Sequence, residues 1–286
     1  MGTIICIANQ KGGVGKTTTA VNLATSLALD GHPTLLIDLD PQCSASSGVG
    51  IQRQSDQPSL YDVLLNSVPA TDAVRSTSIE RLSVLPASRD LVGAEIELVP
   101  TIARERRMEE SLEPVRSRYS FLVIDCPPSL GLLTLNALTA SDSLLIPLQC
   151  EYYALEGLSA LLETVGLVRD RLNPRLAIEG VVLTMFDTRN SLSHQVAAEI
   201  RTHFPNDLFE TVIPRNVRLS ESPSHGLPAV IYDPSSRGAQ AYRALAVELV
   251  ARRTGQAIPA PPADEEPVGG RVGEESASEA WNDGTE

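Results

Sequence analysis

Two hydrophobic patterns alternate along most of the chain. Short runs of consecutive apolar residues predict buried strands over 3–8, 34–40, 121–125, 143–149, 178–187 and 227–233. Between them, apolar side chains recur every three or four positions, which predicts helices over 17–31, 100–117, 131–140, 154–172, 191–203 and 236–252. Because buried strands that alternate with helices form parallel sheets covered on both faces, we expect an α/β fold with a doubly wound, mostly parallel sheet.

The end of the chain has a different composition from the rest. Residues 254–286 are rich in Pro, Gly, Ser and Glu and carry eight acidic residues against one basic residue. Such a segment has almost nothing to bury. We therefore expect one folded domain over residues 1–253 and a disordered acidic tail over residues 254–286.

Composition also bears on the compartment. The chain has no 18-residue apolar run and no basic region followed by an apolar run at its N-terminus, so we expect neither a membrane span nor a secretion signal. The four cysteines (Cys6, Cys43, Cys126 and Cys150) are scattered, and none forms a C-x-x-C pair. This usage favours a reducing cytoplasm over a disulfide framework.

The glycine-rich stretch NQKGGVGKTT, residues 9–18, holds both lysines of a chain whose other 21 basic residues are arginine. Its end matches the Walker A pattern G-x-x-x-x-G-K-[ST], although Gln10 stands where the first glycine belongs. Glycines between a strand and a helix let successive backbone N–H groups point into one concavity, to which the helix adds its positive end. The predicted phosphate-binding residues are Lys11, Gly12, Gly13, Val14, Gly15, Lys16, Thr17 and Thr18, with Lys16 on the β- and γ-phosphates and Thr17 on Mg²⁺. The cofactors expected are ATP and Mg²⁺.

Three acids follow predicted strands. Asp38 and Asp40 close the run LLIDLD, and Asp125 closes FLVID. Four apolar residues followed by Asp form a Walker B pattern, whose carboxylate helps to hold Mg²⁺, usually through water. The pattern alone is weak because many strands end in Asp, but it gains weight beside the glycine loop. A purely structural role for Asp40, capping the turn at Pro41, stays open.

The stretch KGGVGKTT resembles the deviant Walker A motif of the ParA/MinD ATPases. The resemblance implies that Lys11 reaches across a dimer interface to the nucleotide of the other subunit. It also implies that Asp40 orients and polarises the attacking water, while Asp38 supports the magnesium site. In this family, the equivalents of DLDPQ and DCPPS are switch regions that sense the γ-phosphate.

Longer segments, among them DCPPSLGLLTLNALTASDS and TVIPRNVRLSESPSHG, resemble the short chromosomal ParA proteins of the Soj subgroup over residues 1–253. The resemblance places Pro214 and Asn216 near the adenine. It implies an ATP-bound sandwich dimer that binds DNA without sequence preference through Arg189 and Arg218. Further candidates for this basic patch are Arg215, Arg237 and Arg243.

The charge distribution is compatible with such a patch. The whole chain carries a net charge of −13, yet residues 169–253 carry 11 basic and 9 acidic residues, a net charge of +2. Non-specific DNA binding needs clustered bases, not a basic protein overall. The resemblance to ParA proteins implies a slow, Mg²⁺-dependent ATP hydrolase that is cytoplasmic and nucleoid-associated and partitions a chromosome or plasmid. It also implies release from DNA when a ParB-type partner stimulates hydrolysis.

Three other classes of protein have a similar phosphate loop and are alternative interpretations. A MinD-like membrane-associated ATPase of cell division would need an amphipathic helix with basic flanks that lies on lipid. The predicted helix over 236–252, which has one apolar side, is the candidate for it. The acidic residues that follow this helix argue against stable membrane association. An iron–sulfur ATPase would need cysteine ligands beyond Cys126. A P-loop ligase such as dethiobiotin synthetase would need a carboxylate-substrate pocket. The sequence does not indicate the role of Glu151, Tyr152 and Tyr153; our hypothesis is a contact with the second subunit of a dimer or with a partner.

Overall fold

The computed structural model describes residues 1–52, 57–151 and 154–256. A seven-stranded sheet with the order β3-β4-β2-β5-β1-β6-β7 forms its centre. Every neighbouring pair is parallel except β3 and β4. The strands are β1 (Thr3–Ile7), β2 (Thr34–Asp38), β3 (Arg75–Ser76), β4 (Leu82–Leu85), β5 (Phe121–Asp125), β6 (Ser143–Gln149) and β7 (Ala177–Thr184). The doubly wound, mostly parallel sheet expected from the sequence is confirmed.

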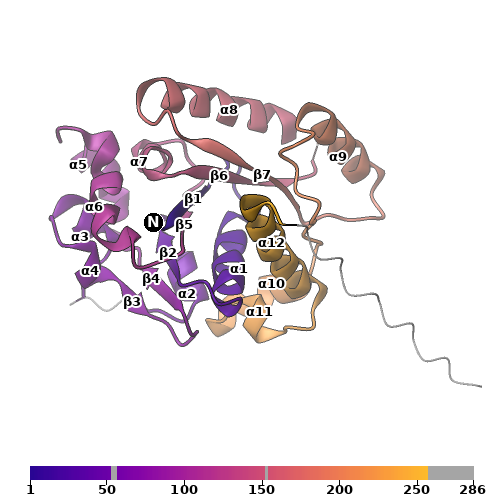
Figure 1. Cartoon of the computed structure of the whole chain (residues 1–286), viewed down its shortest axis with the longest axis horizontal. Helices are drawn as coiled ribbons and strands as arrows, with labels where there is room; N and C mark the ends of the chain where they lie inside the picture. The colour runs from indigo at the N-terminus through magenta and orange to yellow at the C-terminus, as the bar shows by residue number, and fades with distance from the viewer. Residues whose placement is uncertain (53–56, 152–153, 257–286) are drawn as a thin grey trace, which may run out of the picture.

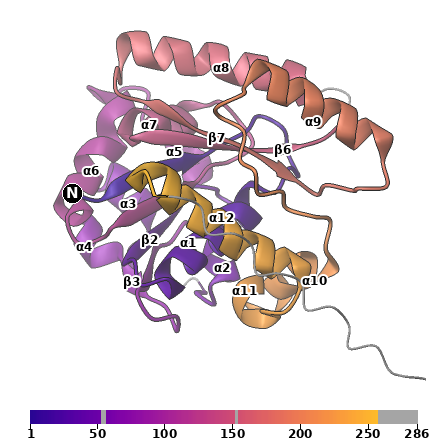
Figure 2. The ribbon, with the colours of Figure 1, turned by 45° about the vertical axis from the view of Figure 1, so that its right-hand side comes forward.

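Helices cover both faces of this sheet (Figure 1). On one face α1 (Lys16–Leu29) and α12 (Arg237–Thr254) lie side by side, as both views show (Figures 1 and 2). The other face carries α6 (Arg107–Arg116), α7 (Leu132–Ala140) and α8 (Ala154–Arg171), with α9 (Ser191–His203) beside them. Each face has its own buried apolar cluster, because alternate residues of each strand point to opposite sides.

Short helices fill the connections. They are α2 (Ser44–Gly48), α3 (Leu60–Leu65), α4 (Ala70–Ala73), α5 (Leu91–Glu97), α10 (Val217–Glu221) and α11 (Ala229–Tyr232), with 3₁₀ turns η1 (Arg104–Arg106) and η2 (Ser222–His225). The helix expected over 100–117 begins with η1 and continues as α6. No helix within the described residues is both long and apolar enough to cross a membrane.

One predicted strand is wrong. Within 227–233, residues Ala229–Tyr232 form the short helix α11, with Pro228 at its N-cap. The backbone N–H of Val230 donates to Asn22 Oδ1 on α1, and α11 packs against α1 and α12. A four-residue apolar run has no periodicity that separates a strand from a single helical turn, so packing decides its conformation.

The boundary expected at residue 253 falls at the end of α12. This helix ends at Thr254, and Gly255 follows in the left-handed conformation with φ 68° that glycine adopts freely. The predicted acidic tail lies outside the described residues from position 257 onward.

Candidate functional site

The glycine loop lies at the carboxyl ends of the strands, between β1 and α1. Two neighbouring strands hold it: Asn9 Nδ2 donates to the Pro147 carbonyl of β6 at 2.8 Å, and Thr184 Oγ1 at the end of β7 donates to the Val14 carbonyl at 2.8 Å. Asn9 Oδ1 in turn accepts the backbone N–H of Lys11 at 3.0 Å. The loop shape is therefore imposed by strands that lie far away in the sequence.

Glycine is required in this loop for conformation. Gly13 and Gly15 have φ of 74° and 88°, in the left-handed region where other residues are strained. A Cβ added at Gly12 or Gly13 would meet no atom within 4 Å, so the loop faces open space. An open loop of this kind at the start of a helix of 14 residues fits the phosphates of a nucleotide.

Lys16 supplies a cation inside the loop. Its side chain is 6% exposed, and its ammonium group donates to the Lys11 carbonyl at 3.0 Å. Burial lowers the pKa of Lys16 below its ordinary value, and this effect is partly opposed by the nearby Asp125. The loop thus contains a buried ammonium group that can contact a bound anion.

Asp125 is the second charged group of the site. It ends β5 in register with Asp38 at the end of β2, and it is fully buried. Neither carboxylate oxygen accepts a hydrogen bond of ordinary geometry among the described residues, although the Thr17 hydroxyl is near enough to favour the ionised form. Burial raises the pKa of Asp125 well above its ordinary value, and repulsion from Asp38 raises it further. A buried carboxylate without hydrogen bonds beside a threonine hydroxyl fits a hydrated divalent cation.

The cation would draw few of its ligands from protein. Within the described ranges, no group of three or more His, Cys, Asp or Glu side chains gathers as a metal cage. Mg²⁺ commonly binds through one or two carboxylates, waters and substrate phosphates, so a site of this composition suits Mg²⁺ held together with a nucleotide.

The substitution Asp125→Asn is expected to raise the stability of the metal-free protein. It removes a buried charge that lacks hydrogen bonds, so the melting temperature at pH 7.5 in a chelator should rise by about 3–8 °C, or roughly 1–3 kcal/mol. Because the folded-state pKa of Asp125 lies above the unfolded value, the folded wild type binds the extra proton and becomes more stable as pH falls through that pKa. The gap between variant and wild type should therefore narrow towards pH 5.

Calorimetry of both proteins between pH 8 and pH 5 measures this gap. Asp170→Asn, a substitution of an exposed carboxylate on α8, is the matched control and should show no gap at any pH. A variant less stable than the wild type at pH 7.5 would contradict the prediction.

Asp38 and Asp40 are already engaged by their neighbours. Asp38 Oδ2 accepts hydrogen bonds from the backbone N–H and the hydroxyl of Ser46, both at 2.7 Å. Burial raises the pKa of Asp38 to about 6, against the lowering effect of the Ser46 hydrogen bonds. Asp40 is half-buried, and its Oδ1 accepts the backbone N–H of Gln42 at 2.9 Å, so it caps the turn at Pro41 in this conformation.

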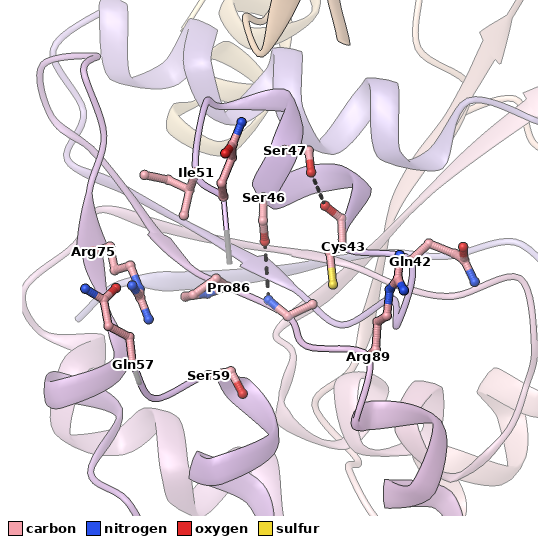
Figure 3. A pocket seen from close by; sticks show the side chains of 12 residues that line it. Gln42, Cys43, Ser46, Ser47, Ile51, Gln57, Ser59, Arg75, Pro86 and Arg89 are labelled. Atoms are coloured by element: carbon pink, nitrogen blue, oxygen red, sulfur yellow. Dashed lines mark hydrogen bonds between the residues drawn. The ribbon is translucent and has the colours of Figure 1, made fainter. Parts of the chain in front are cut away.

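Ser46 carries this network further, a role that the sequence did not indicate. Its hydroxyl also accepts the backbone N–H of Ala87, after β4, at 3.3 Å. Ser46 and Ala87 both line a pocket of about 410 Å³, and the side chains of Arg75 and Arg89 line it as well (Figure 3). The end of β2 is thereby tied to the end of β4.

Lys11 lies at the rim of the loop and is paired within its own chain. Its ammonium group forms an ion pair with Glu151, just before α8, and the two side chains are 40% and 47% exposed. Glu151, whose role the sequence left open, is thus the partner of Lys11 in this conformation. Tyr152 and Tyr153 lie outside the described residues.

Pro214 and Asn216 lie beside the loop, as the predicted adenine contacts would require. Together with Gly15 and Thr18 they line a pocket of about 110 Å³. Asn216 also caps α10, because its Oδ1 accepts the backbone N–H of Arg218 at 2.9 Å. Chain segments about 200 residues apart in sequence therefore meet at one site.

The two arginines predicted to contact DNA are exposed but paired with acids. Arg189, with 87% of its side chain exposed, pairs with Asp187 at 3.0 Å, and its hydrogen bonds lower the pKa of Asp187 to about 2. Arg218 pairs with Glu221 at 2.8 Å and with Asp233 at 3.1 Å. DNA phosphates would have to replace these carboxylates.

Known proteins resemble the chain over most of its length. A family model described as an AAA domain matches residues 2–178. The sporulation initiation inhibitor protein Soj of Bacillus subtilis (strain 168) is 57% identical over 251 residues, covering 88% of this chain and 99% of that protein. The chromosome partitioning protein ParA of Myxococcus xanthus (strain DK1622) is 55% identical over 254 residues, covering 89% and 90%.

The fold has a similar counterpart among solved structures. The structure of cobyrinic acid a,c-diamide synthase from Mycobacterium smegmatis, with a bound ATP analog and magnesium, superimposes with a TM-score of 0.80 at 34% identity, covering 91% of this chain and 98% of that one. The partitioning proteins share far more sequence with the chain than this enzyme does. The chain therefore belongs to the ParA/MinD family of P-loop ATPases, among the Soj and ParA chromosome-partitioning proteins.

Proposed function

We propose that this partitioning ATPase is a nucleotide-controlled DNA-binding switch. The observation that supports it most is that an open glycine loop with buried Lys16 lies at the strand end next to that of Asp125. The buried carboxylate of Asp125 accepts no hydrogen bond of ordinary geometry from the described residues. The loop with Lys16 can bind the anionic phosphates, and the Asp125 carboxylate can bind a cation. A nucleotide with its metal requires both.

Each part of the nucleotide has candidate residues in the chain. The backbone of residues 12–15 with Lys16 and Thr18 binds the phosphates, while Pro214 and Asn216 contact the adenine. Thr17 and Asp125 hold Mg²⁺, and Asp38, oriented by Ser46, supports them. The metal, when bound, neutralises phosphate charge. Asp40 orients the attacking water, and hydrolysis is slow until a partner improves this geometry.

Dimerisation in this proposal depends on Lys11. In the ATP-bound state two subunits face each other, and Lys11 of each leaves Glu151 to contact the phosphates bound by the other. Its ammonium is a compact charge on a flexible stem and starts half-exposed at the loop rim, so it can reach outward. Pairing of subunits then reports which nucleotide is bound.

DNA binding and release complete the cycle. The dimer aligns two copies of the patch around Arg189 and Arg218 on the nucleoid, and a ParB-type partner stimulates hydrolysis and releases it. The membrane-associated alternative has less support. The apolar side of α12, formed by Ala239, Tyr242, Leu245, Ala246 and Leu249, is at most 1% exposed and packs in the core.

Gel shifts with a non-specific duplex test the switch directly. We expect retardation with ATP and Mg²⁺, little with ADP, and a steep loss of binding with salt. Equal retardation with ADP and ATP would contradict the proposal.

The substitutions Arg189→Gln and Arg218→Gln are each expected to weaken ATP-dependent DNA binding by about tenfold. Each removes two phosphate contacts from a dimer, so the slope of log K against log [salt] should fall by about 2 in magnitude. Arg81→Gln is the control, because Arg81 has the same exposed side-chain fraction as Arg218, 49%, and is also paired with a neighbouring acid. Fluorescence anisotropy at several salt concentrations measures both quantities, and an unchanged slope for Arg218→Gln would count against its role.

A further inference from the structure

Exposed apolar side chains gather on one side of the molecule. Among the described residues, eight large hydrophobic side chains are exposed, and four of them lie within an 11-residue stretch: Val92, Ile96, Val99 and Ile102. A fifth, Leu167, lies on α8. Single exposed apolar residues are common on protein surfaces, but a cluster indicates an interaction site.

A groove of about 770 Å³ runs beside this cluster. The residues that line it come from α7, from α5 with the segment that follows it, and from α8. Helix α7 contacts both α5 and α8. The lining is mainly aliphatic, with Val99, leucines of α7 and Leu167 of α8. Its charged residues are Glu95, Arg104, Glu105 and Arg171. Its shape and chemistry suit the apolar face of a short helix.

One wall carries a carboxylate with one buried oxygen that accepts no hydrogen bond from the described residues. Glu95 lines the groove, and its Oε1 is buried without a hydrogen bond in the part of the chain that the structure describes. It lies over Gly131, the N-cap of α7, where a Cβ would come within 1.9 Å of it. The helix N-terminus stabilises this charge in part, but a hydrogen-bond donor is still missing. Arg104, also in the lining, is engaged with Glu105 at 2.9 Å.

The groove is connected to the nucleotide site through the chain. Six residues, 126–131, separate Asp125 from the start of α7 at Leu132. This segment is held at both ends: the backbone N–H of Cys126 donates to the Ile7 carbonyl, and Thr134 Oγ1 donates to the Ser129 carbonyl at 2.6 Å. A molecule that displaces α7 therefore acts on the strand end that carries Asp125.

We propose that this groove binds a short amphipathic helical segment of the ParB-type partner, with its apolar face on α7 and a lysine or arginine donating to Glu95. The inference rests on the proposed function, because it names where the stimulating partner binds. A second copy of the chain fits less well. Helix α5 carries Glu95 and Glu97 and no base, so a symmetric contact between two α5 helices supplies no cation.

The test uses full-length protein and the purified ParB-type protein of the same organism. Leu167→Gln and Val99→Gln change side chains that are 57% and 53% exposed, so the fold should be kept. Each is expected to weaken partner binding, and to raise the partner concentration needed for half-maximal ATPase stimulation, by about tenfold. Glu95→Gln should have a similar effect. Basal ATPase and ATP-dependent DNA binding should be unchanged.

Two control substitutions match these changes elsewhere on the surface. Leu29→Gln alters a side chain that is 39% exposed at the end of α1, and Glu113→Gln removes an exposed carboxylate from α6. Neither should alter partner binding.

The outcomes separate this inference from the proposed function. Equal binding of the partner to Leu167→Gln, Glu95→Gln and wild type would overturn the groove assignment, even with the DNA switch intact. Amide exchange protected by the partner only outside residues 92–102 and 132–172 would also overturn it. Self-association of the wild type without nucleotide or partner, lost in Leu167→Gln, would assign the groove to a second copy. Absence of ATP-dependent DNA binding in the wild type would instead reject the proposed function.

Discussion

Alanine at Lys11 is expected to abolish ATP-driven dimerisation while leaving ATP binding by the monomer within about threefold of wild type. The monomer keeps Lys16, Thr17 and the loop backbone, which are the groups that the proposed function assigns to the phosphates of its own site. The dimer loses two desolvated contacts between an ammonium and phosphate, each worth about 2–5 kcal/mol in an interface. Dimer affinity should therefore fall by about 1,000-fold or more.

Sedimentation velocity with ATP and Mg²⁺ measures this effect, and a nucleotide-binding titration on the same samples shows that the loop is intact. If Lys11→Ala self-associates at the same ATP concentration as the wild type, the proposed mechanism of the switch is wrong.

Glu151→Gln is the informative companion to Lys11→Ala, because it removes the acid that holds Lys11 in the monomer. Ion pairs this exposed are worth about 0–1 kcal/mol, and each subunit of the dimer gives up one, so the dimerisation constant should rise by at most about 30-fold. Glu156→Gln, on the first turn of α8, makes the same charge change without that contact and should behave as wild type. A large loss of dimer in Glu151→Gln would show instead that Glu151 is itself part of the dimer interface.

Alanine at Asp40 is expected to lower the ATPase rate by about 100- to 1,000-fold while the ATP-bound dimer accumulates on DNA. Orientation and polarisation of water by a positioned carboxylate contribute a rate enhancement of about this size. In this proposal Asp40 takes no part in the dimer contact of Lys11 or in DNA binding by the arginine patch. Single-turnover hydrolysis and gel shifts on the same protein measure the two effects. Retained hydrolysis would remove Asp40 from the chemistry.

The turn at Pro41 complicates this substitution, because Asp40 Oδ1 accepts the backbone N–H of Gln42. Asp40→Asn keeps an oxygen acceptor for that bond and removes the negative charge. If the loss arises from chemistry, Asp40→Asn should be nearly as slow as Asp40→Ala. If it arises from the turn, Asp40→Asn should recover most of the rate.

The glycine loop and the acid after β5 could be predicted from the sequence because each pattern lies within one short segment. The glycines, Lys16 and Thr17 occupy consecutive positions, and positive φ at Gly13 and Gly15 is a local requirement. Asp125 follows an apolar run in a single segment. Such motifs can be recognised without knowledge of the rest of the fold.

The errors have an equally local origin. Residues 227–233 were predicted as a strand because an apolar run of four residues fits either a strand or a helical turn, and contacts with α1 and α12 decide between them. The strands β3 and β4 were not predicted. The first has two residues, and the second is a short run, LSVL, in which Ser83 interrupts the apolar residues.

The amino-acid sequence by itself determined the parallel α/β architecture, the phosphate loop and the acids at the strand ends, since each depends on neighbours within a few positions. Only the tertiary structure decided that Glu151 pairs with Lys11, that Ser46 binds Asp38, that Thr184 holds the loop and that Asp125 has no hydrogen-bond partner among the described residues. The physical reason is that pairing and burial are properties of what surrounds a side chain. At this site, most of those surroundings come from strands and loops far away along the chain.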